Sequence, residues 1–175
     1  MKGITMNQEN DPIFREKQKF SSSLCWVLVC SLVVGVAIIV SVLAIQDSVD
    51  AAVLITAILG GIVAPVAIVA LVLLTSLETE VRSDGIYVRL FPFHIHHRNF
   101  PAEDLSECYA RTYKPIREYG GWGIRCGFGK GIGRAYNMRG NQGVQLVFKN
   151  GKRLLIGSQK PDELAEAIQS IMKSH

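Results

Sequence analysis

Two long apolar runs, separated by a short acidic connector, constrain the fold of this chain more than any other feature. Leu24–Ile45 and Ala51–Leu77 contain no charged residue, and only Gln46-Asp47-Ser48-Val49-Asp50 lies between them. About 20 apolar residues in a helix are enough to cross the hydrocarbon core of a bilayer. Each run is long enough to do this alone. The sequence therefore predicts a transmembrane helical hairpin over residues 24–77, with helices over 24–45 and 51–77.

The hairpin divides the rest of the chain into a short flank and a part large enough for a domain. Residues 1–23 are too few to form a hydrophobic core, so we expect a cytosolic N-terminal flank that is partly disordered. Residues 78–175 are numerous enough for one compact soluble domain. The first run is longer than the apolar region of a secretory signal, which predicts an uncleaved membrane segment.

The charges beside the apolar runs predict the membrane topology. Lys17 and Lys19 precede the first run and Arg82 follows the second, whereas the connector carries only Asp47 and Asp50. Lys and Arg in short flanks are retained on the cytoplasmic side. We therefore expect a multi-pass protein of the inner cell membrane with two helices and both termini in the cytoplasm.

The apolar runs themselves predict an anchor rather than a transport path. Neither run contains Asp, Glu, Lys, Arg or His, which would be the usual sign of an ion or proton path. Ser31 and Gly35 in the first run, and Gly60 and Ala64 in the second, have the four-residue spacing that lets helices approach closely. Pro65 is expected to kink the second helix.

The segment before the hairpin mixes aromatic and basic residues. If Pro12–Phe20 is helical, Phe14 and Phe20 would lie at the level of the lipid headgroups and the lysines would reach lipid phosphates. The alternative is a solvated flank that extends the first membrane helix.

After the hairpin the pattern changes to a period of two. Ile86, Val88 and Leu90 alternate with more polar residues, as on a half-buried strand. Further strands are predicted over 93–100, 105–111, 144–148 and 153–157, with a type I′ turn at Asn150-Gly151. Pro161 begins an amphipathic helix that carries Leu164, Ile168, Ile171 and Met172 on one face. About seven short antiparallel strands closed by a C-terminal helix predict an α+β domain of pleckstrin-homology (PH)-like sandwich or barrel type.

Several motifs along the chain are specific enough to compare with known families. They are Phe14–Phe20, Leu77–Arg82, Phe91–His94, Arg117–Arg125 (Arg-Glu-Tyr-Gly-Gly-Trp-Gly-Ile-Arg), Arg134–Asn137, Gly140–Leu146 and Leu155–Gln159. On these motifs the chain resembles an uncharacterised prokaryotic family of two-helix membrane proteins with a cytosolic PH-like domain. The resemblance covers all but about the first dozen residues. It implies the fold and the topology, but it supplies no activity. Its one departure is Ala102, where relatives often have Trp, and this bears on local packing only.

A basic and aromatic stretch over residues 111–139 is the strongest binding candidate. A domain tethered beside a bilayer could dock such a stretch on anionic headgroups, each Lys or Arg contributing about 1 kcal/mol. Nucleic acid is not expected as the partner, because the tether brings lipid or a membrane protein nearer. In the alternative interpretation the aromatic residues are core residues and the cations are only solvated. The candidate lipid- or partner-binding residues are Arg111, Lys114, Arg117, Trp122, Arg125, Lys130 and Arg134.

Two further patterns could indicate cofactor or metal chemistry, but neither has the required spacing. Glycine alternates over residues 127–133 without the order of a Walker loop or a dinucleotide fingerprint, so a β-hairpin tip is predicted there. His94, His96 and His97 with Cys108 or Cys126 provide no second ligand pair of matching spacing for zinc. We expect no catalytic residue, no cofactor and no metal.

These observations together favour a non-enzymatic, membrane-anchored interaction module. Its basic and aromatic region would contact anionic lipid or a membrane-protein partner. One alternative is a hydrolase or transferase acting at the bilayer through His94, His96 or Cys126. Another is a structural subunit that assembles as a homo-oligomer through the Gly60–Ala64 surface of its second helix.

Overall fold

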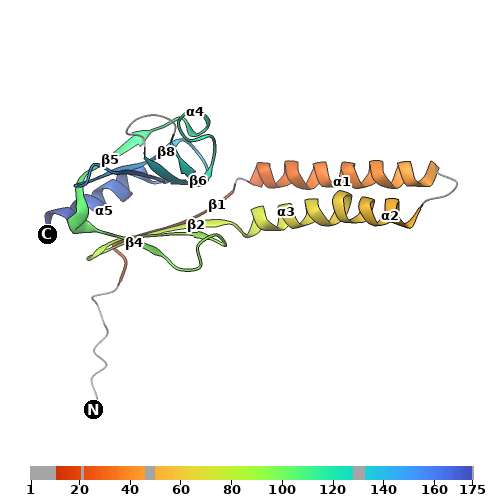
Figure 1. Cartoon of the computed structure of the whole chain (residues 1–175). Helices are drawn as coiled ribbons and strands as arrows, with labels where there is room; N and C mark the ends of the chain where they lie inside the picture. Colours follow the sequence, from red (N-terminus) through yellow and green to blue (C-terminus); the bar gives the residue numbers. More distant parts are fainter. Residues whose placement is uncertain (1–10, 21, 46–49, 128–132, 175) are drawn as a thin grey trace, which may run out of the picture. The chain divides into compact units, whose positions relative to one another are not determined.

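The chain folds into two compact units. The computed structural model describes residues 11–20, 22–45, 50–127 and 133–174. One unit is the helical hairpin, Phe20–Thr75, and the other joins the chain up to Lys19 with the chain from Ser76 onward. We call the second unit the sheet unit. The secondary structure is α+β, with two sheets and a few helices (Figure 1).

The helical hairpin contains two helices that are long and apolar enough to cross a membrane, over Cys25–Ala44 and Ala51–Leu74. The second ends three residues before the predicted end at Leu77, because Leu77 is fully buried in the first sheet. The elements of the helical hairpin are α1 (Ser22–Ile45), α2 (Ala51–Ile58), the π-helical segment η2 (Leu59–Val63) and α3 (Ala64–Leu74).

The second long helix of the hairpin is irregular just before Pro65, where the π-helical segment η2 lies. Proline cannot donate the backbone hydrogen bond of a regular helix, and the preceding turn widens so that the Ala64 N–H donates to the Leu59 carbonyl. The two long helices of the hairpin approach each other closely at Gly61, where a Cβ atom would overlap the side chain of Ile39. The predicted small residues Gly35 and Gly60 instead have open space where a Cβ would lie.

The sheet unit contains two separate sheets. The first has the strand order β1-β2-β3-β4, and the second has the order β5-β8-β9-β7-β6. The prediction of about seven antiparallel strands is too low in number, and it is wrong in direction for one strand pair. In the described residues there are nine strands, and β7 and β9 are parallel. No closed barrel forms among them. The strands are β1 (Phe14–Lys19), β2 (Ser76–Arg82), β3 (Gly85–Phe91), β4 (Arg98–Pro101), β5 (Leu105–Thr112), β6 (Gly123–Cys126), β7 (Arg134–Asn137), β8 (Gln142–Phe148) and β9 (Arg153–Gly157).

Strand β1 corrects two predictions about the N-terminal flank. Its residues form neither an interfacial helix nor an extension of α1, but pair antiparallel with β2 from Phe14↔Val81 to Lys19↔Ser76. Inward-facing Gln18 donates from Nε2 to the carbonyl of Gly157 in the second sheet, at 2.8 Å. Two residues earlier, Glu16 accepts hydrogen bonds from the Ser158 hydroxyl at 2.6 Å and the Gln159 N–H at 2.9 Å. The sheet unit therefore includes β1 and does not begin at residue 78.

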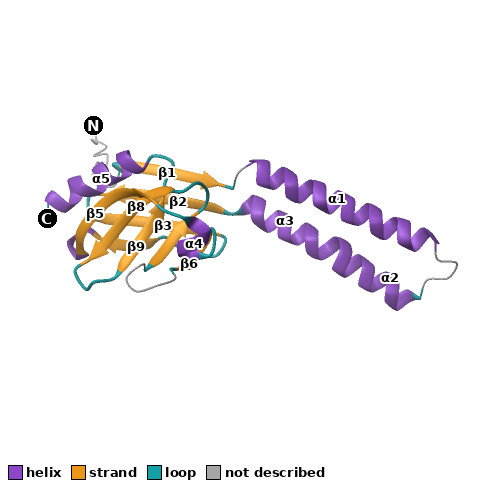
Figure 2. Ribbon diagram, turned by 90° about the horizontal axis from the view of Figure 1, so that it is seen from above, coloured by secondary structure: helices purple, strands orange, loops and turns teal. Residues whose placement is uncertain are grey.

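The C-terminal helix α5 (Pro161–Lys173) covers one side of the two sheets. It contacts β5 and β8 of one sheet and β2 of the other (Figure 2). Leu164, Ile168 and Ile171 are buried on its inner face, as the helical spacing predicts.

The β8–β9 hairpin is also confirmed, but its predicted turn type is wrong. Among the described residues only glycines have positive φ, and a type I′ turn would require it at Asn150 as well as at Gly151. Instead the Gly151 N–H donates to the Phe148 carbonyl at 2.9 Å.

The outward face of β2 carries two buried carboxylates that tie three strands together. Glu78 binds Lys17 Nζ at 2.6 Å and accepts from Arg89 Nε at 3.0 Å. Glu80 binds Arg15 Nε at 3.2 Å and Arg82 Nη2 at 2.6 Å. Burial alone would raise the pKa of Glu78, but the hydrogen bonds from Lys17 and Arg89 outweigh it, and the net pKa is lowered.

This lowered pKa predicts loss of stability in acid. A carboxyl whose folded pKa lies below its ordinary value stabilises the fold above that value, here 4.5, and the contribution is lost as pH falls through the folded pKa. We expect the free energy of unfolding to fall as the pH is lowered through 4.5 and below. Denaturant titrations across this range will measure it. Glu78→Gln should make the dependence shallower, and an unchanged slope in that variant would contradict the assignment.

Candidate functional site

Strand register defines two ends of the sheet unit. Lys19 pairs with Ser76, and Ser76 pairs with Phe91. Lys19 and Ser76 are also the residues at which the chain passes into and out of the helical hairpin. The hydrogen bond from Gln18 to Gly157 places the corresponding end of the second sheet beside them. We call this end of the sheet unit the helix-linked end. The opposite ends of the strands form the distal end, which includes Pro101, Arg134 and Arg153.

The segment between β5 and β6 covers the helix-linked end of the second sheet. The Tyr113 N–H donates to the Asn141 carbonyl at 2.8 Å, just beyond the end of β5. A short helix, α4 (Pro115–Tyr119), follows and ends at Gly120, whose φ of 70° needs a residue without a Cβ. Trp122 Nε1 then donates to the Gly140 carbonyl at 3.2 Å. Most of the predicted binding residues therefore lie at this end.

Three tyrosines of the stretch are core residues, as the alternative interpretation predicted. Tyr113, Tyr119 and Tyr136 are all buried. The rings of Tyr113 and Tyr119 meet edge to face, with 5.9 Å between their centroids. Burial raises the pKa of both phenols, which keeps them neutral at physiological pH. Tyr113 and Tyr119 support the segment between β5 and β6 and are not available to a partner.

Arg111 is occupied within the fold. Its Nη2 donates to Glu118 Oε2 at 2.9 Å and to the Tyr119 hydroxyl at 3.1 Å, and its Nε donates to Gln145 Oε1 at 3.1 Å. Burial alone would raise the pKa of Glu118, but the Lys114 N–H and Arg111 outweigh it and lower that pKa. Arg111 thus fastens α4 to the second sheet.

The remaining predicted residues of this segment are exposed. Arg125 Nε donates to the Trp122 carbonyl at 2.9 Å, which holds the two residues together. Trp122 is 38% exposed although its indole N–H is bonded, and Ile116 is 69% exposed. Together these residues form a cationic surface in which apolar side chains lie among the charged ones. We call it the α4 surface, and it consists of Lys114, Ile116, Arg117, Trp122 and Arg125.

Sequence reasoning missed a second exposed group at the same end. The predicted strand over 93–100 is wrong, because β4 begins only at Arg98, and the preceding residues form a loop after Pro92. Phe93 and Ile95 in this β3–β4 loop are 60% and 74% exposed. Between them, His94 packs against Tyr136 with 5.7 Å between the ring centroids. The sequence signal for this loop was Pro92. It interrupts the strand pattern, so the apolar residues that follow it are not covered by a sheet.

Of the two remaining predicted binding residues, one is outside the described residues and one lies at the distal end. Lys130 and the predicted hairpin tip over 128–132 are outside the described residues, although β6 and β7 do pair antiparallel. Arg134 begins β7 at the distal end.

The residues weighed for metal or nucleophilic chemistry are not brought together. Across the described ranges, no group of three or more His, Cys, Asp or Glu side chains could hold a metal ion. Cys108 is buried against α5, where its Sγ lies 3.8 Å from the Ala165 carbonyl, and burial raises its thiol pKa to about 12. Cys126 is exposed in β6.

Comparison with models of known families gives a match over nearly the whole chain. Residues 6–175 match the family described as "Family of unknown function (DUF6141)". No curated protein matches the chain.

Proposed function

The chain belongs to the family of unknown function DUF6141, and from this premise we propose that it is a membrane-anchored, non-enzymatic interaction module. The helical hairpin is the anchor in the cell membrane, with both termini in the cytoplasm. The sheet unit is a PH-like domain on the cytoplasmic side. Two apolar helices, two packed sheets and the covering helix α5 support this proposal.

The partner of the helix-linked end is the anionic surface of the bilayer that holds the hairpin. The observation that carries this proposal is the position of the exposed groups. The α4 surface and the β3–β4 loop lie at the end of the sheet unit where the chain continues into both apolar helices. Because paired strands are about 5 Å apart, Phe91 lies about one strand spacing from Ser76, which closely follows the last residue of α3.

The chemistry of these groups suits a headgroup layer. Lys114, Arg117 and Arg125 are exposed cations, and each Lys or Arg near an anionic surface contributes about 1 kcal/mol. Three such residues would change the ratio of docked to undocked domain by about two orders of magnitude. Trp122 presents an apolar ring with a polar edge, which is the composition favoured at membrane interfaces.

Trp122 also provides a direct test of docking. The chain has two tryptophans, so Trp26→Phe leaves Trp122 as the only reporter. We expect acrylamide to quench Trp122 several-fold less in nanodiscs of phosphatidylglycerol than in nanodiscs of phosphatidylcholine. The protection should disappear in high salt, because exposed charges are screened within about 3 Å at 1 M salt. Lys114→Glu, Arg117→Glu and Arg125→Glu together should abolish it in low salt.

A matched control separates this surface from the total charge of the protein. Lys149→Glu, Lys152→Glu and Arg153→Glu make the same change in charge at the distal end, and they should leave the protection of Trp122 intact. Equal quenching in anionic and neutral nanodiscs would overturn bilayer docking and leave a membrane protein as the partner of the α4 surface.

A further inference from the structure

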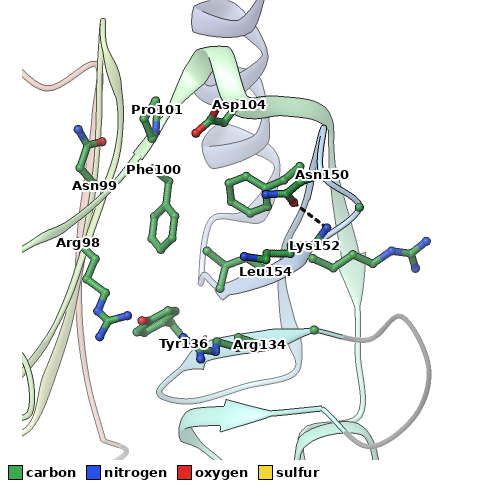
Figure 3. Close-up of a pocket in the computed structure, with 14 residues that line it drawn as sticks. Arg98, Asn99, Phe100, Pro101, Asp104, Arg134, Tyr136, Asn150, Lys152 and Leu154 are labelled. Carbon is green, nitrogen blue, oxygen red and sulfur yellow. Dashed lines mark hydrogen bonds between the residues drawn. The ribbon is translucent and has the colours of Figure 1, made fainter.

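A pocket opens at the distal end of the sheet unit, where the edge strand β4 faces β7 and β9 of the other sheet. It has a volume of about 600 Å³. Phe100 and Pro101 line it from one sheet, and Tyr136 and Leu154 from the other (Figure 3). This volume lies within the range of small-molecule sites, about 300–1,000 Å³.

Aromatic side chains form the inner wall of this distal pocket. The ring of Phe100 lies 6.0 Å from that of Phe148 and 6.5 Å from that of Tyr136, measured between centroids. Phe100 and Phe148 are half-buried, whereas Tyr136 is buried. The pocket therefore offers two accessible rings to the apolar or planar part of a ligand.

The rim of the pocket is strongly cationic. Arg98, Arg134, Lys152 and Arg153 line it and are exposed, and Asp104 is the only acidic residue among the described residues of the lining. None of these four cations forms an ion pair with any residue in the described part of the chain. Figure 3 shows Arg98 reaching from β4 toward Tyr136, beside which Arg134 lies. The pKa of the nearby His94 is lowered, first by burial and then by the charge of Arg98.

The backbone places two of these cations on neighbouring strands. Gly133 has a φ of +80°, and a Cβ at this position would overlap the backbone carbonyl of Arg153. Only glycine allows this approach of β7 to β9. Arg134 then pairs with Leu154, next to Arg153. Cations from both sheets therefore line the same pocket.

We propose that the distal pocket binds a small organic phosphate. Guanidinium groups bind phosphate through paired, charge-assisted hydrogen bonds. Arg98 and Arg134 have no ion-pair partner among the described residues, so we expect them to supply such bonds. Phe100 and Phe148 would contact the organic part. The phosphate could belong to a soluble molecule or to a phospholipid headgroup. The proposal does not depend on bilayer docking, because it concerns a different surface.

The test uses the full-length protein in nanodiscs with 1-naphthyl phosphate as the probe, measured by calorimetry. We expect saturable binding of one equivalent, and weaker binding of inorganic phosphate and of neutral 1-naphthol. Arg98→Ala with Arg134→Ala should reduce the affinity for 1-naphthyl phosphate by about tenfold or more. Lys114→Ala with Arg117→Ala, which removes the same charge at the helix-linked end, should leave it unchanged.

The lipid composition of the nanodisc distinguishes the two sources of phosphate. If a headgroup is the natural ligand, phosphatidic acid in the nanodisc will lower the apparent affinity for the probe relative to phosphatidylcholine. If the ligand is soluble, the affinity will be the same in both. Absence of saturable binding, or equal binding by the Arg98→Ala, Arg134→Ala variant with an unchanged thermal melt, would overturn the proposal.

Discussion

Deletion of Phe14–Gln18 is expected to unfold the sheet unit while leaving the helical hairpin in the membrane. The deletion removes nearly all of the edge strand of the first sheet. Of the six residue pairs between β1 and β2, only that of Lys19 with Ser76 remains. It also removes the hydrogen bond from Gln18 to Gly157 and the two that Glu16 accepts from Ser158 and Gln159, between β9 and α5. Both buried carboxylates of β2 lose one cationic partner, since Lys17 and Arg15 are absent.

The expected loss is comparable to the whole stability of the unit. Leaving a buried charge with fewer partners and buried polar groups unpaired costs about 1–3 kcal/mol for each group. Several such groups exceed about 5 kcal/mol, the lower end of the stability of a domain. Thermal melts and limited proteolysis of the purified protein will measure the loss. A cooperative melt at the wild-type temperature would contradict the role assigned to β1.

Addition of the missing strand in trans provides the control. A synthetic peptide spanning Asp11–Lys19 should restore protection from proteolysis, because it can add to the exposed edge of β2. The same peptide with Phe14→Asp should not, since Phe14 is buried in the first sheet. Failure of both peptides would indicate that deletion acts through the linkage to α1 instead of through the loss of β1.

Gly143→Val is expected to cost about 3 kcal/mol or more of the stability of the sheet unit. Gly143 in β8 pairs with Gly157 in β9. A Cβ at Gly143 would overlap the carbonyl oxygen of Ile156 and lie 3.0 Å from Gly157 Cα, and these are backbone atoms in the interior of the sheet. The strands must therefore separate to admit a side chain. Chemical denaturation followed by the emission of Trp122 will measure the loss.

A second glycine offers a matched comparison. Gly60 lies in the helical hairpin with open space where a Cβ would lie. Gly60→Ala should leave the denaturation midpoint of the sheet unit unchanged, whereas Gly143→Ala should lower it. Equal midpoints for the two alanine variants would show that β8 and β9 can move apart without cost.

The N-terminal strand shows where sequence reasoning fails and why. A half-buried strand is recognised by apolar residues at every second position. The inward side of β1 instead carries Glu16 and Gln18. Glu16 accepts a hydrogen bond from Ser158, and Gln18 donates one to the carbonyl of Gly157, far along the chain. The local alternation of apolar and polar residues contains no information about such distant partners. The same holds for Arg111, which is indistinguishable in the sequence from the exposed Arg117 until Glu118 and Gln145 are placed around it.

The candidate binding groups were predicted in part. The α4 surface came from the predicted stretch, because clustered cations and aromatic residues are visible in the sequence. The distal pocket was not foreseen apart from Arg134. Its other cations, Arg98, Lys152 and Arg153, belong to strands and a hairpin distant from residue 134 in the chain.

The sequence by itself determined the two apolar helices, the β8–β9 hairpin and the amphipathic helix α5. Each of these depends on residues within one turn, one hairpin or one helix length, so local composition is sufficient. Only the tertiary structure decided that β1 belongs to the sheet unit, that β7 and β9 are parallel, and which charged side chains of the described residues form ion pairs. These properties depend on contacts between segments far apart in the chain, where burial and pairing override local preference.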